Sequence, residues 1–201
     1  MKSKNNDKRI EKGDETYNRI LLSAVDLISE SGIRGITASK LSTLSNVSKS
    51  NIFHHFKTTQ EIPEAVLNLI FSELIRPIDD SEAENLAEFL NYLGSSVINV
   101  SEEYKKVYKS FFSFYYESMF HEAYQKILRD FLQTSKVDLT RQIKRNSRKS
   151  LSDQEANAFS TLIIATLDGI GLHILMEEEK EEYLKAWDLQ VRFICNTLNN
   201  N

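Results

Sequence analysis

The stretch that decides the fold is residues 35–56, which read GITASKLSTLSNVSKSNIFHHF. Thr37 and Ser48 each suit the N-cap of a short helix, because a hydroxyl oxygen can accept from a backbone N–H that the first helical turn leaves open. Asn46, between the two helices, tolerates the left-handed backbone that a tight turn needs. The stretch therefore predicts two short helices over about 38–44 and 48–55.

The second short helix has one apolar face and one polar face. Ile52 and Phe56 are four residues apart and point inward, while Val47 can fill the angle between the helices. Two short helices, a three-residue turn and a polar second helix make a helix-turn-helix, whose second helix enters the major groove of DNA. The candidate DNA-binding residues are Thr37, Ser48, Lys49, Ser50, Asn51, Phe53, His54, His55 and Lys57.

Several polar side chains of this stretch can contact bases or phosphates of DNA. Asn51 can pair with adenine N6 and N7, and Lys49 can donate to guanine O6 and N7 or to a phosphate. The hydroxyls of Thr37 and Ser48 suit phosphate contacts, or serve as helix caps alone.

Three further residues are expected near the DNA backbone, namely His54, His55 and Lys57. The alternative for His54 is a solvated surface position. The alternative for His55 is a place at the edge of the core, with a local hydrogen bond.

The segment resembles the DNA-binding domain of the TetR family of bacterial transcriptional regulators. The resemblance covers about residues 17–63 and implies an N-terminal three-helix helix-turn-helix domain followed by a larger all-helical regulatory and dimerisation domain. The expected division is therefore a polar arm (1–16), the DNA-binding domain (17–63) and an effector-binding and dimerisation domain (64–201). The residues that carry the resemblance are Arg19-Ile20-Leu21, Ala24, Leu27, Gly32, Thr37, Leu41, Val47-Ser48-Lys49, Ile52-Phe53, His55-Phe56 and Ile62.

The chain departs from the family pattern at positions that face DNA. The family usually has Tyr in place of Phe53, Lys in place of Thr59 and commonly Gly in place of Ser50. A lost hydroxyl and a lost positive charge each weaken contacts to phosphate, which dominate affinity. We expect DNA binding that is weaker or more salt-sensitive than in relatives. The alternatives are an all-α effector- or protein-binding module with weakened DNA binding, or a regulator that acts as an activator.

Composition predicts an all-α fold. The 201 residues include only 6 Gly and 2 Pro, fewer than the frequent turns of a sheet protein require. Apolar positions recur at helical spacing elsewhere in the chain. Further helices are expected over about 20–31, 60–76 (ending near Pro77), 81–101, 102–132, 152–176 and 181–198, with Ser81–Glu84 and Ser152–Glu155 as capping boxes.

The charge of the chain is divided between its two ends. The formal net charge is −4, and residues 1–60 hold 10 Lys/Arg and 6 Asp/Glu, a net of +4. The remaining 141 residues hold 15 Lys/Arg and 23 Asp/Glu, a net of −8. A basic end on an acidic body is the pattern of a nucleic-acid-binding domain attached to a different kind of domain.

The acidic body contains a dense aromatic run over residues 104–131. Such a run fills a core, or it lines an apolar pocket with hydroxyls that face a ligand. The resemblance favours the pocket, because regulators of this family usually bind a small effector in the body. An apolar or amphipathic effector is expected, with the candidate lining Phe71, Phe89, Tyr92, Tyr108, Phe111, Phe112, Tyr115, Tyr116 and His173.

The last two helices are apolar around much of their circumference, which favours burial on several sides. The resemblance implies that this pair forms a four-helix interface between two copies, and C2 symmetry matches a palindromic operator. The expected interface residues of the homodimer are Phe159, Ile163, Leu167, Ile170, Ile174, Trp187, Val191 and Ile194.

Several function classes find no support in the sequence. No nucleophile with a nearby base, carboxylate pair or metal triad stands out, so neither an enzyme nor a metal or cofactor site is expected. A single Cys excludes an internal disulfide. No run approaches the roughly 18 apolar residues of a membrane helix, and no signal peptide opens the chain. A cytoplasmic protein without a membrane partner is expected.

Overall fold

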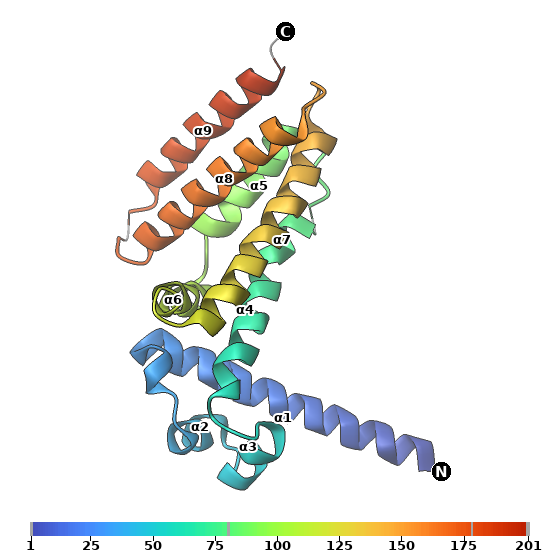
Figure 1. Cartoon of the computed structure of the whole chain (residues 1–201), viewed down its shortest axis with the longest axis vertical. Coiled ribbons are helices and arrows are strands. Elements are labelled where there is room, and N and C mark those ends of the chain that lie inside the picture. Colours follow the sequence, from blue (N-terminus) through green and yellow to red (C-terminus); the bar gives the residue numbers. More distant parts are fainter. Residues whose placement is uncertain (1, 80, 178, 200–201) are drawn as a thin grey trace.

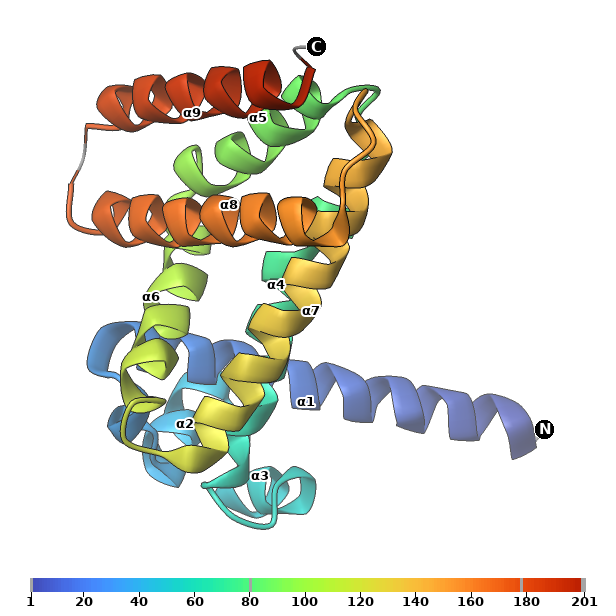
Figure 2. The same ribbon diagram turned by 45° about the horizontal axis from the view of Figure 1, so that its top comes forward.

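The computed structural model describes residues 2–79, 81–177 and 179–199, and within these ranges the chain forms α-helices and one 3₁₀ turn but no strand. The all-α prediction is confirmed. A small helix-turn-helix end lies below a larger helical body (Figures 1 and 2). The elements are α1 (Lys2–Ser31), the 3₁₀ turn η1 (Ile33–Gly35), α2 (Ala38–Ser45), α3 (Lys49–His55), α4 (Glu61–Asp79), α5 (Leu86–Ile98), α6 (Glu102–Glu117), α7 (Glu122–Asn146), α8 (Asp153–Ile174) and α9 (Glu181–Asn199).

Local side-chain chemistry sets the bounds of α2 and α3 as the sequence predicts. The Thr37 hydroxyl oxygen accepts from the backbone N–H of Lys40 at 3.2 Å, which starts α2. Asn46 ends α2 in the left-handed conformation, with φ of 53°. The Ser48 hydroxyl oxygen accepts from the backbone N–H of Asn51 at 3.3 Å, which starts α3.

Two hydrophobic cores hold the molecule together. The lower core joins α1, α2 and α3 to α4, α6 and α7, with Leu41 and Ile52 fully buried against Ile20 and Ile28 of α1. The upper core joins α5 to α7, α8 and α9, and also includes Ile78 near the end of α4. Because the lower core contains residues of both the helix-turn-helix and the body, the DNA-binding end is packed directly against α4 and α6.

The predicted polar arm is helical and continuous with α1. The helix begins at Lys2, far before the first apolar stripe at Ile20, and its N-terminal half projects beyond the body in both views (Figures 1 and 2). Apolar periodicity marks a helix only where one face is buried, so a projecting polar helix gives no such pattern. Met1 lies outside the described residues.

The predicted end of α4 near Pro77 is too early, because the helix continues to Asp79. Proline has no N–H and cannot donate to the carbonyl oxygen of Glu73, four residues earlier. The Tyr104 hydroxyl of α6 donates to that oxygen at 2.9 Å. A side chain from a neighbouring helix therefore supplies a hydrogen bond that the proline cannot make.

One of the two predicted capping boxes is confirmed and the other is wrong. Ser152 and Glu155 accept from each other's backbone N–H groups, at 3.2 and 3.0 Å. Residues from Ser81 precede α5 instead of starting it, and Asn85 is the cap, since its side chain accepts from the backbone N–H of Glu88 at 3.0 Å. Asparagine competes well with serine as an N-cap, so a spacing rule based on serine selects the wrong residue here.

The packing of α5 against α9 depends on a glycine. A Cβ atom at Gly94 would lie 2.0 Å from Trp187 Nε1, which donates to the carbonyl oxygen of Leu90 at 2.9 Å. The indole of Trp187 is 3% exposed and therefore has no room to move outward. The absent side chain of Gly94 allows the two helices to approach this closely.

We expect Gly94→Ala to lower the free energy of unfolding by about 1–3 kcal/mol, because the added methyl group must displace the indole and strain its hydrogen bond. Denaturant titration followed by circular dichroism measures this change. The control is Gly13→Ala in α1, where no atom lies within 4 Å of an added Cβ. Alanine has a higher helix propensity than glycine, so Gly13→Ala should raise the free energy of unfolding by up to about 1 kcal/mol. Equal effects of the two variants would contradict the close approach of α5 and α9.

Candidate functional site

The N-terminal half of α3 presents its polar side chains to solvent at one end of the molecule. Lys49, Ser50 and Asn51 are all exposed, and Phe53 is 46% exposed beside them. In both views α2 and α3 lie at the end opposite to α9, with no other helix covering α3 from below (Figures 1 and 2). The residues that the sequence assigns to base contact thus lie together on an open helix face.

The two capping hydroxyls remain available for DNA. Thr37 and Ser48 use an oxygen lone pair to accept from the helix backbone, and both residues are exposed. A hydroxyl that accepts can still donate its proton to a phosphate oxygen. Ser48 Oγ also lies 3.0 Å from Ser50 Oγ. Capping and phosphate binding are therefore compatible at these positions.

The residues around the end of α3 differ in exposure. His54 and Lys57 are exposed, whereas His55 is half-buried with its ring 6.0 Å from the ring of Tyr17 on α1. Tyr17 also stacks on Phe56, with ring centroids 5.1 Å apart. His55 therefore lies at the edge of the core, which is the alternative that the sequence left open. Lys40 is an exposed cation in the first turn of α2, and it is absent from the DNA-binding residues predicted from the sequence.

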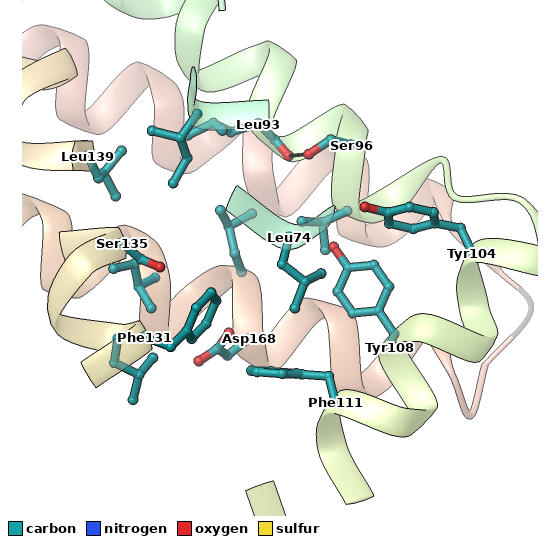
Figure 3. Close-up of a pocket in the computed structure, with 15 residues that line it drawn as sticks. Leu74, Leu93, Ser96, Tyr104, Tyr108, Phe111, Phe131, Ser135, Leu139 and Asp168 are labelled. Atoms are coloured by element: carbon teal, nitrogen blue, oxygen red, sulfur yellow. Dashed lines mark hydrogen bonds between the residues drawn. The ribbon is translucent and has the colours of Figure 1, made fainter. Parts of the chain in front are cut away.

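A cavity of about 90 Å³ lies in the body, between α4, α5, α6, α7 and α8 (Figure 3). Of the predicted lining residues, Tyr108 and Phe111 of α6 face it. Figure 3 also shows Tyr104, Phe131, Ser135 and Asp168 around the same space. The full lining is Leu74, Ile78, Leu93, Ser96, Val97, Tyr104, Tyr108, Phe111, Phe131, Leu132, Ser135, Leu139, Ile164, Leu167 and Asp168.

The other predicted pocket residues lie elsewhere. Phe71, Phe112 and Tyr115 pack behind the cavity wall, and Phe71 stacks on Phe131 with centroids 3.9 Å apart. Phe89 is fully buried in the upper core. A helix turns only one face towards a cavity, so the rest of an aromatic run must pack or be exposed. The predicted residues that point to solvent are Tyr92, Tyr116 and His173.

Four of the cavity residues that sequence reasoning missed carry an aromatic ring or a polar group. Tyr104 and Phe131 belong to the aromatic run and were not selected from it. Ser135 gives no pattern, because a serine in a polar helix is common. Asp168 is a single carboxylate in an apolar stretch of α8, and that contrast is the feature that could have identified it.

The cavity is mainly apolar but contains one carboxylate. Burial raises the pKa of Asp168 to about 6, because its charged form is poorly solvated there. Burial also raises the pKa of the Tyr108 hydroxyl, which therefore stays neutral. The buried Ser135 hydroxyl has no hydrogen-bond partner among the described residues. Asp168 and Ser135 are thus two polar groups of the cavity whose hydrogen-bonding capacity the described residues do not fill.

The predicted dimer residues require a correction, because most of them are buried inside a single chain. Ile163, Ile170 and Ile174 of α8 pack in the upper core, as do Trp187, Val191 and Ile194 of α9. Phe159 and Leu167 are partly buried against the same core. Both helices are apolar on two faces, and the sequence cannot tell which face is turned inward. The large apolar side chains that stay exposed on and beside these two helices are Leu162, Leu172, Met176, Leu184, Leu189 and Phe193.

Two other kinds of site were examined in the described residues. No group of three His, Cys, Asp or Glu side chains among them is placed to hold a metal ion. Of the described helices, α8 alone is long and apolar enough to span a membrane by length and composition. It packs against α5, α6 and α7 along one side and leaves much of its surface exposed.

Comparison with known proteins identifies relatives of the chain. Residues 20–66 match the family model of bacterial regulatory proteins of the tetR family. The chain is 29% identical over 108 residues to the uncharacterized HTH-type transcriptional regulator YvkB of Bacillus subtilis (strain 168). That match spans 54% of this chain and 56% of the relative, so it covers about half the length of each.

Solved structures share the complete fold. A transcriptional regulator from Rhodococcus sp. Rha1 superposes with a TM-score of 0.78 at 20% identity, over 92% of this chain and 98% of that one. A regulator from Saccharomonospora viridis, solved in complex with choline, superposes with a TM-score of 0.68 at 17% identity, over 89% and 96%. The arrangement of a helix-turn-helix under a helical body is therefore common to these chains.

We expect Asp168→Asn to raise the free energy of unfolding at pH 7 by about 1–3 kcal/mol, since a shift of one pKa unit corresponds to about 1.4 kcal/mol. The folded pKa of about 6 exceeds the ordinary value of 3.8, so the wild type loses stability as pH rises between these values. The gain should therefore shrink towards zero as pH falls from 7 to 4. Denaturant titration at several pH values measures it.

The control is Asp130→Asn, an exposed carboxylate on α7. Its effect should stay within about 0.5 kcal/mol at every pH. A pH-independent effect of Asp168→Asn would show that this carboxylate is not desolvated.

Proposed function

The chain belongs to the TetR family of bacterial transcriptional regulators, and from this premise we propose that it is a cytoplasmic, dimeric repressor that releases a palindromic operator when a small molecule binds in its body. The observation that carries the proposal is that α6 both lines the cavity and packs against α1 of the DNA-binding end. The proposed division is residues 17–63 for DNA binding and 64–201 for effector binding and dimerisation.

The proposed DNA contact uses α3 in the major groove. Asn51 and Lys49 are exposed at its N-terminal end, where they can reach base edges. Thr37 and Ser48 donate hydroxyl protons to phosphates on either side. Phe53 has no hydroxyl for a phosphate, and its exposed ring instead offers an apolar contact such as a thymine methyl group accepts.

The proposed dimer forms through the exposed face of α8 and α9. Leu189 and Phe193 are 63% and 60% exposed and lie four residues apart on α9, while Leu172 is 41% exposed on α8 and Met176 is 69% exposed just beyond its end. Monomeric proteins rarely leave a contiguous apolar face of this kind in water. A symmetric pair of chains would cover it and would present two α3 helices to two half-sites.

The proposed coupling between effector and DNA passes through α6. This helix contributes Tyr104, Tyr108 and Phe111 to the cavity. The same helix is fixed to α1, since Lys106 Nζ lies 2.7 Å from an Asp26 carboxylate oxygen.

A second, buried contact lies one turn further along α6. The Ser110 hydroxyl donates to the backbone carbonyl oxygen of Val25 at 3.1 Å. Since α1 packs on α2 and α3, a ligand that displaces α6 also displaces the DNA-reading helix.

The end of α6 is connected to the helix-turn-helix by charge. Glu117 is 8% exposed, and its carboxylate lies 3.0 Å from the His121 imidazole and 3.5 Å from the Arg34 guanidinium. Arg34 belongs to η1, which directly precedes α2. Movement at the end of α6 is thus transmitted to the start of the helix-turn-helix.

Two finer points belong to this proposal. The regulator from Saccharomonospora viridis was solved with choline, which supports a small molecule as the effector in this fold. The same contacts also suit an activator, in which the ligand favours DNA binding instead of release. A non-enzymatic role fits the regulators that share the fold.

We expect Lys49→Ala combined with Asn51→Ala to weaken operator binding at least about 30-fold, because each good base contact contributes about 1–3 kcal/mol. The operator is obtained by selection from a random duplex library with the full chain, and affinity is measured by fluorescence anisotropy at several salt concentrations. If Lys49 contacts phosphate, the slope of log affinity against log salt should fall by about 1.

Lys149→Ala provides the matched control, since this exposed lysine lies between α7 and α8, far from α3. It should leave affinity unchanged. Equal losses in the control and the double variant would contradict the assignment of α3 as the reading helix.

We expect Phe193→Glu to convert the protein to a monomer, because a charge is placed on the exposed apolar face of α9. Sedimentation velocity at micromolar concentration measures the assembly state, and circular dichroism verifies the fold. Val137→Glu on α7 is the control, since Val137 is 47% exposed on another helix and should not affect assembly. A Phe193→Glu protein that remains dimeric would refute the proposed interface.

A further inference from the structure

The cavity in the body carries a single negative group, and its chemistry specifies the class of effector. We propose that the cavity binds a small primary alkylammonium ion, with its charge held by Asp168 and its apolar body held by the surrounding rings and aliphatic side chains (Figure 3). This inference rests on the proposed function in taking the cavity as the effector site, but it concerns ligand binding itself and does not require DNA.

The lining selects by charge. Among its fifteen residues there is no Lys, Arg or His, and the ionisable groups are Asp168 and the neutral phenols of Tyr104 and Tyr108. An anionic ligand would meet a like charge with no cation to balance it. A cation would find a carboxylate in a poorly solvated space, where the attraction is stronger than in water.

Asp168 is not already neutralised by the protein. Among the described residues, none donates a hydrogen bond to its carboxylate and none forms an ion pair with it. Two other carboxylates of the molecule behave differently, since Glu117 and Asp26 each pair with a cation. An ionised carboxylate left without a partner in an apolar cavity costs stability, which a bound ammonium group would restore.

Ser135 supplies a second polar contact. Hydroxyls in these helices usually donate to a backbone carbonyl in the preceding turn, as Thr134 does to Asp130 at 3.0 Å and Ser96 to Leu93 at 2.8 Å. Ser135 is 5% exposed and makes no such bond, although its oxygen lies in the cavity wall. An ammonium group has three N–H donors, so it can donate to Asp168 and to a hydroxyl oxygen together.

The aromatic rings of the lining also favour a cationic ligand. Phe111 and Phe131 lie with Asp168 on the same side of the cavity, and Tyr108 lies next to them (Figure 3). Ring faces attract a cation that approaches them. The aliphatic part of the lining, which includes Leu74, Leu93 and Leu139, suits a short hydrocarbon chain.

The size of the cavity limits the ligand. Its volume of about 90 Å³ is smaller than the ~150 Å³ of an engineered apolar cavity that accepts benzene. The ligand is therefore expected to contain about six non-hydrogen atoms or fewer. A branched C4 amine fits this limit.

The test compares three ligands of one carbon skeleton and different charge, all within this size limit, namely isobutylamine, isobutyl alcohol and isobutyrate. Each is titrated into the full-length protein at pH 7.5 by isothermal titration calorimetry. We expect the amine to bind at least about tenfold more tightly than the alcohol, as a hydrogen bond to a charged group is typically worth that factor or more. Isobutyrate should show no binding.

Variants assign the preference to the cavity. Asp168→Asn should reduce amine affinity about 10- to 100-fold and leave that of the alcohol nearly unchanged. Ser135→Ala should weaken the amine by a few-fold without loss of stability, because the hydroxyl has no partner to lose. The matched control Asp130→Asn, an exposed carboxylate on α7, should bind all three ligands as the wild type does.

The outcomes separate this inference from the proposed function. If the alcohol or isobutyrate binds as tightly as the amine, if none of the three binds, or if Asp168→Asn keeps the amine preference, the alkylammonium inference is wrong. Operator binding and dimer formation would stand unaffected by that result. If the amine binds with the expected preference but does not release labelled operator, the inference holds and the proposed coupling to DNA fails.

Discussion

The contact between α6 and α1 is the constraint on which the two ends of this molecule depend. The Ser110 hydroxyl reaches the backbone of Val25 in a buried site, and Lys106 pairs with Asp26 close by. A hydrogen bond buried in this way is costly to break without replacement, so the two helices move together or not at all. Because α6 also lines the cavity, the helix that is fixed to α1 forms part of the cavity wall as well.

The sequence predicted the helix-turn-helix well because its determinants are local. Caps at Thr37 and Ser48 and the left-handed residue Asn46 act within three or four positions, and the structure has each of them as expected. The cavity is different, since it is assembled from five helices. Periodicity shows that α6 has an aromatic face, but which face meets the cavity depends on packing against helices far away in the sequence. Only Tyr108 and Phe111 were identified for this reason.

The last two helices show a related limit. Both α8 and α9 have two apolar faces, one that packs inside the chain and one that stays exposed. A hydrophobic pattern shows that both faces exist, but not which of them packs against the rest of the chain. The residues predicted for the dimer interface are therefore those of the buried face. The continuation of α4 beyond Pro77 was also missed because it depends on a distant part of the sequence. The hydrogen bond that replaces the one proline cannot make comes from Tyr104 of another helix.

The separation of charge along the molecule has a consequence for how it approaches its target. The first 60 residues carry a net charge of +4 and the remainder −8, and α2 and α3 lie at the opposite end to α9. Such a molecule has a large electric dipole, and the field of a polyanion exerts a torque that turns its basic end forward before contact. Diffusion to DNA becomes partly oriented, and the acidic bodies of molecules on adjacent sites repel each other. Occupancy of closely spaced operators would then be limited by this repulsion, which salt screens.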